Sequence, residues 1–324
     1  MTQGSQLLMM PYATALVLAA VAHGHPMQAA GTAGTAESER PTARGTEFAT
    51  LLGGSSPDSL VTPGVGYYAG KEIASYGPPI GTPTVWICFV GSSELTPTTT
   101  AACKDGYSPA GSKPPSTALL FTNIGGGAGA GDIEQSITPA GLSSVVSMAP
   151  TLKANGFSGV SFDMETLSGF ASYDDFSQAM KYAVGNCTAA GLLTLLTTAK
   201  SGISTGALLN GGLPSVNNGR TQPWPGGTTT FATFQEDVVP LFDIYSPQCY
   251  SSGTQVGSVH DICIPFGGIS YAGFSGAKHF WPSVGGKWVQ SLNGADPVDT
   301  LNAESGTNFG PDITVTGYIV FNKI

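Results

Sequence analysis

Two carboxylates, Asp163 and Glu165, are spaced for acid–base chemistry. They end segment 156–165, where polar and apolar side chains alternate. Because successive side chains of a β-strand point to opposite faces, Ser161, Asp163 and Glu165 share one face, opposite an apolar one. Residues two apart stand about 6.6 Å from each other along a strand. At that spacing each carboxyl group favours the protonated form of the other, which can keep one of them available as an acid.

The alternative for this pair is structural. Carboxylates at the end of a strand can cap it by accepting hydrogen bonds from loop amides or by pairing with a basic neighbour. A parallel strand that is buried on both faces is normally apolar on both. The polar face of 156–165 therefore favours a position facing a barrel axis, at the carboxyl end of a strand, where barrel active sites lie.

The elements around this segment predict an α/β fold. Short apolar runs, each expected to be a strand, recur along the chain at 65–69, 84–90, 117–124, 157–165, 192–198, 244–250, 279–284 and 314–321. Helical spacing of apolar residues predicts helices at 142–154 and 173–190, and more weakly at 230–242 and 288–303. No helix is expected between the second and third strands, where Thr, Pro and Gly dominate. Eight alternating units favour a single-domain (β/α)₈ TIM barrel over an open sheet.

With these elements in place, the sequence resembles glycoside hydrolase family 18, the chitinases and endo-β-N-acetylglucosaminidases. The family's fourth strand reads D-G-x-D-x-D-x-E, which Gly159, Asp163 and Glu165 match, while Ser158 and Ser161 replace its first two aspartates. Further segments resemble the family in the same order, across 65–324. Residues 65–68 resemble the family's first strand, and residues 123–126 resemble its S-x-G-G third-strand motif with Asn123 in place of Ser. Residues 243–250 resemble the sixth strand of hevamine-type members, with Ser251 in place of Asn, and 317–321 resemble the eighth strand, with Phe321 in place of Trp.

This resemblance implies a retaining, substrate-assisted glycosidase that acts on β-1,4-linked N-acetylglucosamine without a metal or cofactor. It implies that Glu165 is the acid and base, and that Asp163 and Tyr250 stabilise the intermediate. The substrate-binding residues that it implies are Tyr67, Gly125, Gly126, Ser161, Gln248 and Phe321. For the three largest of these, Tyr67, Gln248 and Phe321, the alternative is an ordinary place in the barrel core.

The departures from the family pattern predict weakened catalysis. Serine at 161 can donate a hydrogen bond but cannot supply the charge or exchange the proton of an aspartate. Phe321 is smaller than Trp and lacks its N–H donor. A rival interpretation follows: a catalytically silent barrel that binds chitin fragments or inhibits another protein. An unrelated α/β barrel with a coincidental D-x-E strand is the third interpretation.

Composition and motifs exclude several other functions. The 324-residue chain carries 12 basic and 21 acidic residues, a net charge of −9, which argues against nucleic-acid binding by phosphate neutralisation. H-E-x-x-H does not occur, and neither His260 nor His279 is near a G-x-S-x-G nucleophile elbow, so zinc-protease and serine-hydrolase chemistry are not supported. The glycine-rich stretch 125–129 is not followed by Lys-Ser/Thr, unlike a phosphate-binding loop.

The N-terminal region predicts export. The apolar run 7–22 ends in Ala20-Val21-Ala22, an A-x-A cleavage site, although no basic residue precedes it. We expect a signal peptide at 1–22, a flexible Gly/Thr/Ala/Pro-rich linker at 23–63 and the barrel domain at 64–324. The mature protein should be a secreted monomer that does not stay in the membrane. An uncleaved membrane anchor is the alternative.

Five cysteines are consistent with an oxidising compartment. Their spacing suggests local disulfides between Cys88 and Cys103 and between Cys249 and Cys263, each closing a loop of about 15 residues. Cys187 is left over, within the sequon Asn186-Cys187-Thr188. That segment is either a glycosylation site or a helix carrying a free thiol.

Overall fold

Part of the chain is described by the computed structural model. The described residues are 60, 63–70, 83–89, 93–104, 114–126, 137–164, 167, 169–198, 237–249, 278–308 and 313–321. The expected signal peptide and all of the linker except Leu60 and Pro63 lie outside them, as do Glu165 and Tyr250.

The strands of the described residues form one parallel sheet that follows the order of the chain. Its nine strands are β1 (Gly64–Gly70), β2 (Val85–Phe89), β3 (Leu119–Gly125), β4 (Gly159–Met164), β5 (Leu193–Thr198), β6 (Ile244–Pro247), β7 (His279–Phe280), β8 (Ser283–Gly285) and β9 (Gly317–Phe321). Each strand from β1 to β6 pairs with the strand that follows it in sequence. In addition, β8 pairs with β9, and β9 pairs with β1.

The ring is closed by an interrupted strand. β7 and β8 are two parts of one extended segment, separated by Trp281 and Pro282. The Trp281 amide donates to the Tyr245 carbonyl of β6, while the Ile319 amide of β9 donates to the Pro282 carbonyl. One segment therefore bridges β6 and β9, and nine strands occupy the eight positions of a (β/α)₈ barrel.

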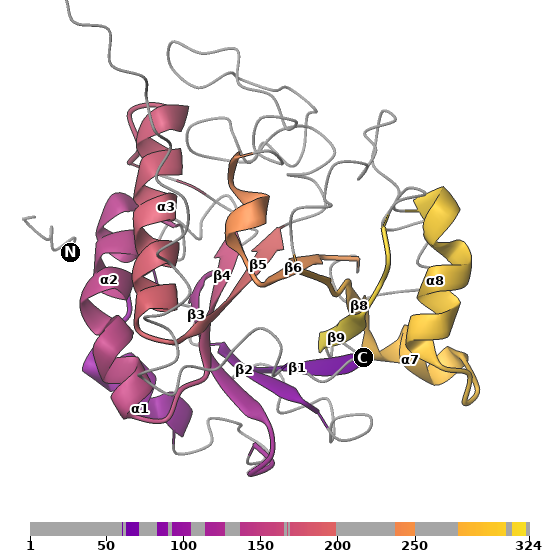
Figure 1. Ribbon diagram of the computed structural model, residues 1–324. Coiled ribbons are helices and arrows are strands. Elements are labelled where there is room, and N and C mark those ends of the chain that lie inside the picture. The colour runs from indigo at the N-terminus through magenta and orange to yellow at the C-terminus, as the bar shows by residue number, and fades with distance from the viewer. Residues whose placement is uncertain are drawn as a thin grey trace, which may run out of the picture. The chain divides into compact units, whose positions relative to one another are not determined.

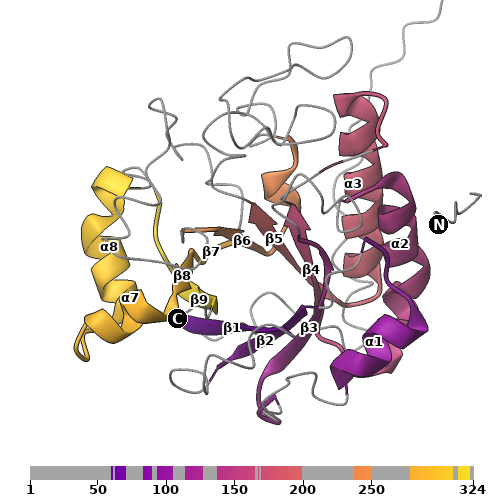
Figure 2. The same cartoon turned by 180° about the vertical axis from the view of Figure 1, so that it is seen from behind.

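The helices lie outside the strands. They are α1 (Pro97–Lys104), α2 (Pro139–Ala154), α3 (Tyr173–Ala189), the 3₁₀ turn η6 (Val239–Leu241), α7 (Gly286–Ser291) and α8 (Pro297–Asn308). Figures 1 and 2 show α2 and α3 side by side, and α7 close to α8. Side-chain hydroxyls cap the two longest: Thr138 accepts from the Gly141 amide and Ser172 from the Asp175 amide.

All eight predicted strands are present, and the TIM-barrel prediction is confirmed. Two expectations about helices are corrected. The connection between β2 and β3 contains α1, and the helix expected at 288–303 is divided into α7 and α8. Asn293 and Gly294 have φ values of 52° and 91°, a left-handed conformation that ends a helix. In the predicted helix 230–242, residues 239–241 form η6 and 230–236 lie outside the described residues.

The large side chain of Trp281 lies inside the amino end of the barrel, next to the first residues of β1 and β9. Trp281 is fully buried, and its indole N–H donates to the Thr316 hydroxyl at 3.0 Å. A Cβ atom built on Gly317 would lie 2.6 Å from the Trp281 ring, and one on Gly64 would also overlap that ring. Glycine at both positions therefore makes room for the indole where β9 meets β1.

The cysteines agree with the predicted pairing as far as they are described. Cys88 and Cys103 form a disulfide that joins β2 to α1, with Cα atoms 5.6 Å apart. Cys249 is disulfide-bonded as well, and its predicted partner Cys263 lies outside the described residues. Cys187 is a buried free thiol on α3. Among the described helices, none has the length and apolar character needed to cross a bilayer.

Candidate active site

Asp163 is the described member of the carboxylate pair. It lies near the carboxyl end of β4, where its side chain is only 4% exposed. Every residue of β4 is buried, so the strand has helices on one side and the barrel interior on the other.

A hydrogen bond across the ring shows which face of β4 points inward. The hydroxyls of Tyr68 on β1 and Thr197 on β5 are 2.5 Å apart. These strands lie four positions apart in the ring, so the two side chains meet inside the barrel. Thr197 is the register partner of Asp163, and partners in parallel strands share a face. Asp163 and, two residues earlier, Ser161 therefore point inward.

Gln248 reaches the Asp163 carboxylate from two strands away. Its side-chain amide Nε2 donates to Asp163 Oδ1 at 3.1 Å, and the Gln248 side chain is itself buried. The structure thus brings together two residues that the sequence assigned to one site from positions 85 residues apart. A neutral amide donor orients the carboxylate without bringing a cation to it.

The predicted substrate-binding glycines, Gly125 and Gly126, lie against the backbone of Asp163. The Gly126 amide donates to the Asp163 carbonyl at 2.8 Å. Both glycines have φ of 86°, and a Cβ atom on Gly125 would overlap the Asp163 carbonyl oxygen. Only glycine fits this close approach of β3 to β4, so the pair helps to fix the position of Asp163.

Below Asp163 the barrel interior holds two polar atoms that have no hydrogen-bond partner among the described residues. Ser161 and Asn123 are register partners on β4 and β3, and both are fully buried. Asn123 Nδ2 donates to the Gly125 carbonyl at 3.3 Å. Neither Asn123 Oδ1 nor Ser161 Oγ has a hydrogen-bond partner among the described residues. Ser161 therefore does not hydrogen-bond to Asp163.

Tyr68 is a site candidate that the sequence prediction missed. The predicted sugar-lining residue, Tyr67, points to the opposite face of β1, where its ring packs on Trp86 with centroids 4.9 Å apart. The adjacent Tyr68 faces inward and also meets Phe321, edge to face, at 5.9 Å. The family motif does not distinguish the two tyrosines. Glycine at 64 and 66, on the same face as Tyr68, is the sequence signal for a crowded interior side.

The predicted catalytic residues Glu165 and Tyr250 lie outside the described residues, so their geometry is not part of this site. What is described is a buried carboxylate oriented by an amide, with Tyr68, Thr197 and partly buried Phe321 on the same interior face. Such a carboxylate can stabilise a developing positive charge. No group of three or more His, Cys, Asp or Glu side chains in the described part of the chain is arranged to bind a metal ion.

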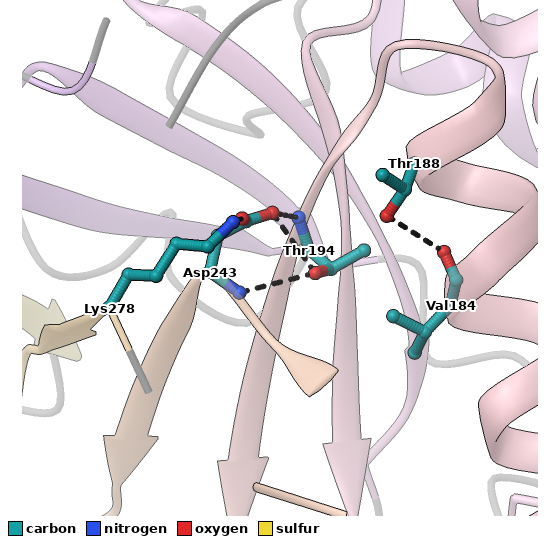
Figure 3. Close-up of polar contacts among 5 residues, drawn as sticks. All are labelled: Val184, Thr188, Thr194, Asp243 and Lys278. Carbon is teal, nitrogen blue, oxygen red and sulfur yellow. Dashed lines mark hydrogen bonds and ion pairs between the residues drawn. The ribbon is translucent and has the colours of Figure 1, made fainter. Parts of the chain in front are cut away.

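A second buried carboxylate, Asp243, belongs to the other end of the barrel. Its Oδ2 accepts from the Thr194 amide at 2.9 Å and from the Thr194 hydroxyl at 3.1 Å, and its Oδ1 pairs with Lys278 Nζ at 2.8 Å. Figure 3 shows Asp243 between these two partners. Because Asp243 directly precedes β6, this group lies at the amino ends of β5, β6 and β7. Polar groups at that end of a barrel serve stability rather than catalysis.

Comparison with known proteins finds solved structures that are similar to this chain. No protein-family model and no curated protein sequence matches the chain. A family GH18 chitinase from Cycas revoluta, in complex with allosamidin, is 10% identical with a TM-score of 0.46, covering 80% of this chain and 94% of that one.

Two further solved structures are similar to a comparable degree. A GH18 chitinase from Pseudoalteromonas aurantia is 14% identical with a TM-score of 0.42, over 81% of this chain and 94% of that one. An endo-β-N-acetylglucosaminidase from Cordyceps militaris is 14% identical with a TM-score of 0.36, over 86% and 87%. These are distant likenesses, and the barrel architecture follows from this chain's own strand pairing.

Proposed function

We propose that this protein is a glycosidase of the family 18 type that cleaves β-1,4-linked N-acetylglucosamine in chitin, chitooligosaccharides or the core of N-glycans. The observation that carries the proposal is the Asp163 carboxylate, buried on the inner face of β4 and hydrogen-bonded by Gln248. Asp163 belongs to the D-x-E sequence that resembles the family's fourth-strand motif.

In the proposed mechanism, Glu165 protonates the glycosidic oxygen as the bond to the anomeric carbon breaks. The substrate's own N-acetyl oxygen attacks that carbon and forms an oxazolinium ion, whose charge is stabilised by Asp163 and the Tyr250 hydroxyl. Glu165, now a carboxylate, takes a proton from water. That water attacks the anomeric carbon and opens the ring, so the configuration is retained. No metal or cofactor takes part.

The surroundings of Asp163 support a slow rather than an efficient enzyme. Where the family motif has an aspartate, this chain has Ser161, which makes no hydrogen bond among the described residues. Asp163 therefore lacks a carboxyl neighbour at this position with which to share a proton. Gln248 keeps the carboxylate oriented, so we expect catalysis to be weakened and not abolished.

The same observation favours a second candidate, a catalytically silent barrel that binds chitin fragments or inhibits another protein. Loss of the aspartate at 161 and of the Trp at 321 would reduce turnover more than binding, because an inward aromatic residue, Phe321, remains. Binding of N-acetylglucosamine oligomers without hydrolysis would identify this second function.

We also propose that the protein is exported. The disulfide of Cys88 with Cys103, the disulfide-bonded Cys249 and the apolar run 7–22 all support an oxidising destination. Expression with the N-terminal segment followed by N-terminal sequencing of the secreted material tests this proposal, with cleavage expected after Ala22.

The enzymatic proposal is tested with Glu165→Gln. Secreted protein and variant are assayed on chitooligosaccharides and on a high-mannose glycoprotein. We expect the variant to lose at least 100-fold in kcat, because general acid catalysis contributes about 10²–10⁴-fold. Asp299→Asn, which removes an exposed carboxylate on α8, is the matched control and should retain full activity. If the unsubstituted protein and Glu165→Gln are equally inactive, the protein is not a glycosidase.

A further inference from the structure

We propose that an ordered water molecule is bound inside the barrel between the side chains of Asn123 on β3 and Ser161 on β4, one inward position below Asp163. The water site rests on observed burial and register. Its effect on Asp163, given below, rests on the proposed function.

The first support is the pairing of two buried polar atoms that lack partners. Asn123 and Ser161 are both 0% exposed and lie opposite each other in register, so their side chains extend from neighbouring strands into the same interior. Asn123 Oδ1 and Ser161 Oγ have no hydrogen-bond partner among the described residues. Nearly all buried polar groups in folded proteins are satisfied by protein or by ordered water, so two adjacent exceptions point to a shared partner.

The second support is that the orientation of the Asn123 amide is determined. Its Nδ2 donates to the Gly125 carbonyl at 3.3 Å, which identifies the other amide atom as the oxygen. An amide oxygen only accepts hydrogen bonds, whereas a serine hydroxyl both donates and accepts. A water molecule satisfies both atoms at once by donating to Asn123 Oδ1 and accepting from the Ser161 hydroxyl.

The chemistry of the two atoms suits water and not a cation. A hard cation takes six or more oxygen ligands and favours carboxylates. Asn123 and Ser161 together supply two neutral oxygens, which fits water.

If the proposed function holds, this water supports Asp163 from below. It keeps the interior beneath the carboxylate polar at the position where the family motif carries an aspartate. Ser161→Asp would place a carboxyl group there, displace the water and restore a neighbour with which Asp163 can share a proton.

Thermal unfolding of two variants tests the water site independently of activity. Ser161→Ala removes one partner of the water, so we expect its Tm to fall by about 2–4 °C. The matched control is Thr122→Val, because Thr122 also has a buried, unpartnered hydroxyl but lies beside Cys88 and Val160 on the outer face. Removing that hydroxyl should leave Tm unchanged or raise it. If Ser161→Ala also leaves Tm unchanged or raises it, no water is bound there and the proposal is overturned.

Crystallography gives a second, direct measurement. A high-resolution structure of the unsubstituted protein should show a density peak within about 2.7–3.2 Å of both Asn123 Oδ1 and Ser161 Oγ. A direct hydrogen bond between the two side chains, or an empty gap, would overturn the proposal.

The activity of Ser161→Asp tests the functional part alone. We expect its kcat on chitooligosaccharides to rise about tenfold above that of the unsubstituted protein. If kcat does not increase, the proposed effect of the water on Asp163 is wrong, whereas the proposal of the water site itself still stands. Absence of hydrolysis in the unsubstituted protein and in Ser161→Asp would instead count against the proposed function.

Discussion

At the scale of single residues, the behaviour of Asp163 depends on the Gln248 amide. The Gln248 side-chain amide donates to Asp163 Oδ1 directly and so fixes the orientation of the carboxylate. Gln248 is a positioning residue in the proposed reaction, because it acts on the substrate through Asp163. Its loss should therefore lower kcat more than it changes KM.

We predict that Gln248→Leu lowers kcat about tenfold with a smaller change in KM, which corresponds to one hydrogen bond of about 1.4 kcal/mol. Gln290→Leu, at an exposed position on α7, is the control and should change neither kcat nor KM. An unchanged kcat in Gln248→Leu would show that Gln248 only fills space.

Cys187 gives a prediction about reactivity. Burial, with the nearby Asp243 carboxylate, raises the pKa of this thiol to about 12. Thiolate is the reactive form, so native Cys187 should resist iodoacetamide at pH 8 and react once the protein is unfolded, as peptide mass mapping would show. Modification of the native protein at the unfolded rate would contradict its burial.

The raised pKa of Cys187 also determines whether its contribution to stability rises or falls with pH. An unfolded thiol releases its proton near the ordinary pKa of 9.0, whereas the folded one holds it to about 12. Between these values the unfolded state binds fewer protons, so the contribution of Cys187 to stability is complete below pH 9 and is lost as the pH rises toward 12. Cys187→Ala should flatten part of that alkaline decline in thermal unfolding.

At the scale of elements, the amino ends of β5, β6 and β7 are held together by Asp243. This carboxylate accepts two hydrogen bonds from Thr194 and pairs with Lys278, while its side chain stays 8% exposed. Lys278 is 56% exposed, so solvent screens its charge and the bonds to Thr194 carry most of the stabilisation. The group lies at the opposite end of these strands from Asp163 and Gln248.

We predict that Asp243→Ala destabilises the protein by about 2–3 kcal/mol, because the Thr194 amide and hydroxyl lose a buried acceptor. Lys278→Met should cost less than about 1 kcal/mol. Below the unfolding temperature, kcat should be unchanged in both variants. Chemical denaturation measures the two effects, and equal losses would show that the ion pair, not the hydrogen bonds, stabilises this end.

At the scale of the whole molecule, the barrel closes around Trp281. The extended segment that contains this residue is the only described connection between β6 and β9, and Gly317 leaves space for the indole ring. Adding a methyl group there would place a carbon 2.6 Å from the Trp281 ring and 2.5 Å from the Gly64 carbonyl oxygen. The contact with the Gly64 carbonyl oxygen is with backbone, so relieving it requires β1 to move relative to β9.

We predict that Gly317→Ala costs about 1–3 kcal/mol through overpacking, or more if ring closure is disturbed. The matched control is Gly185→Ala on α3, where an added Cβ would meet no atom within 4 Å. Because alanine has a higher helix propensity than glycine, that variant should gain up to about 1 kcal/mol. Similar destabilisation by both substitutions would mean that the effect is not specific to the closure of the barrel.

The sequence by itself determined the eight strand positions, the two longest helices and the D-x-E segment. These features depend on local periodicity, which a single strand or helix carries within its own residues. The disulfide of Cys88 with Cys103 also followed from spacing along the chain and is confirmed. Of the two alternatives for Cys187, the structure shows the free thiol on a helix. The roles of Glu165 and Tyr250 remain predictions.

Only the tertiary structure decided which of two adjacent tyrosines faces the barrel interior, and that Gln248 reaches Asp163. It also decided that Asn123 Oδ1 and Ser161 Oγ extend from paired strands without a hydrogen-bond partner among the described residues, and that the seventh barrel strand is interrupted at Trp281 and Pro282. Each of these depends on the register between strands far apart in sequence. A shift of one residue in that register would exchange the inner and outer faces of a strand, so these contacts depend on residues outside the strand itself.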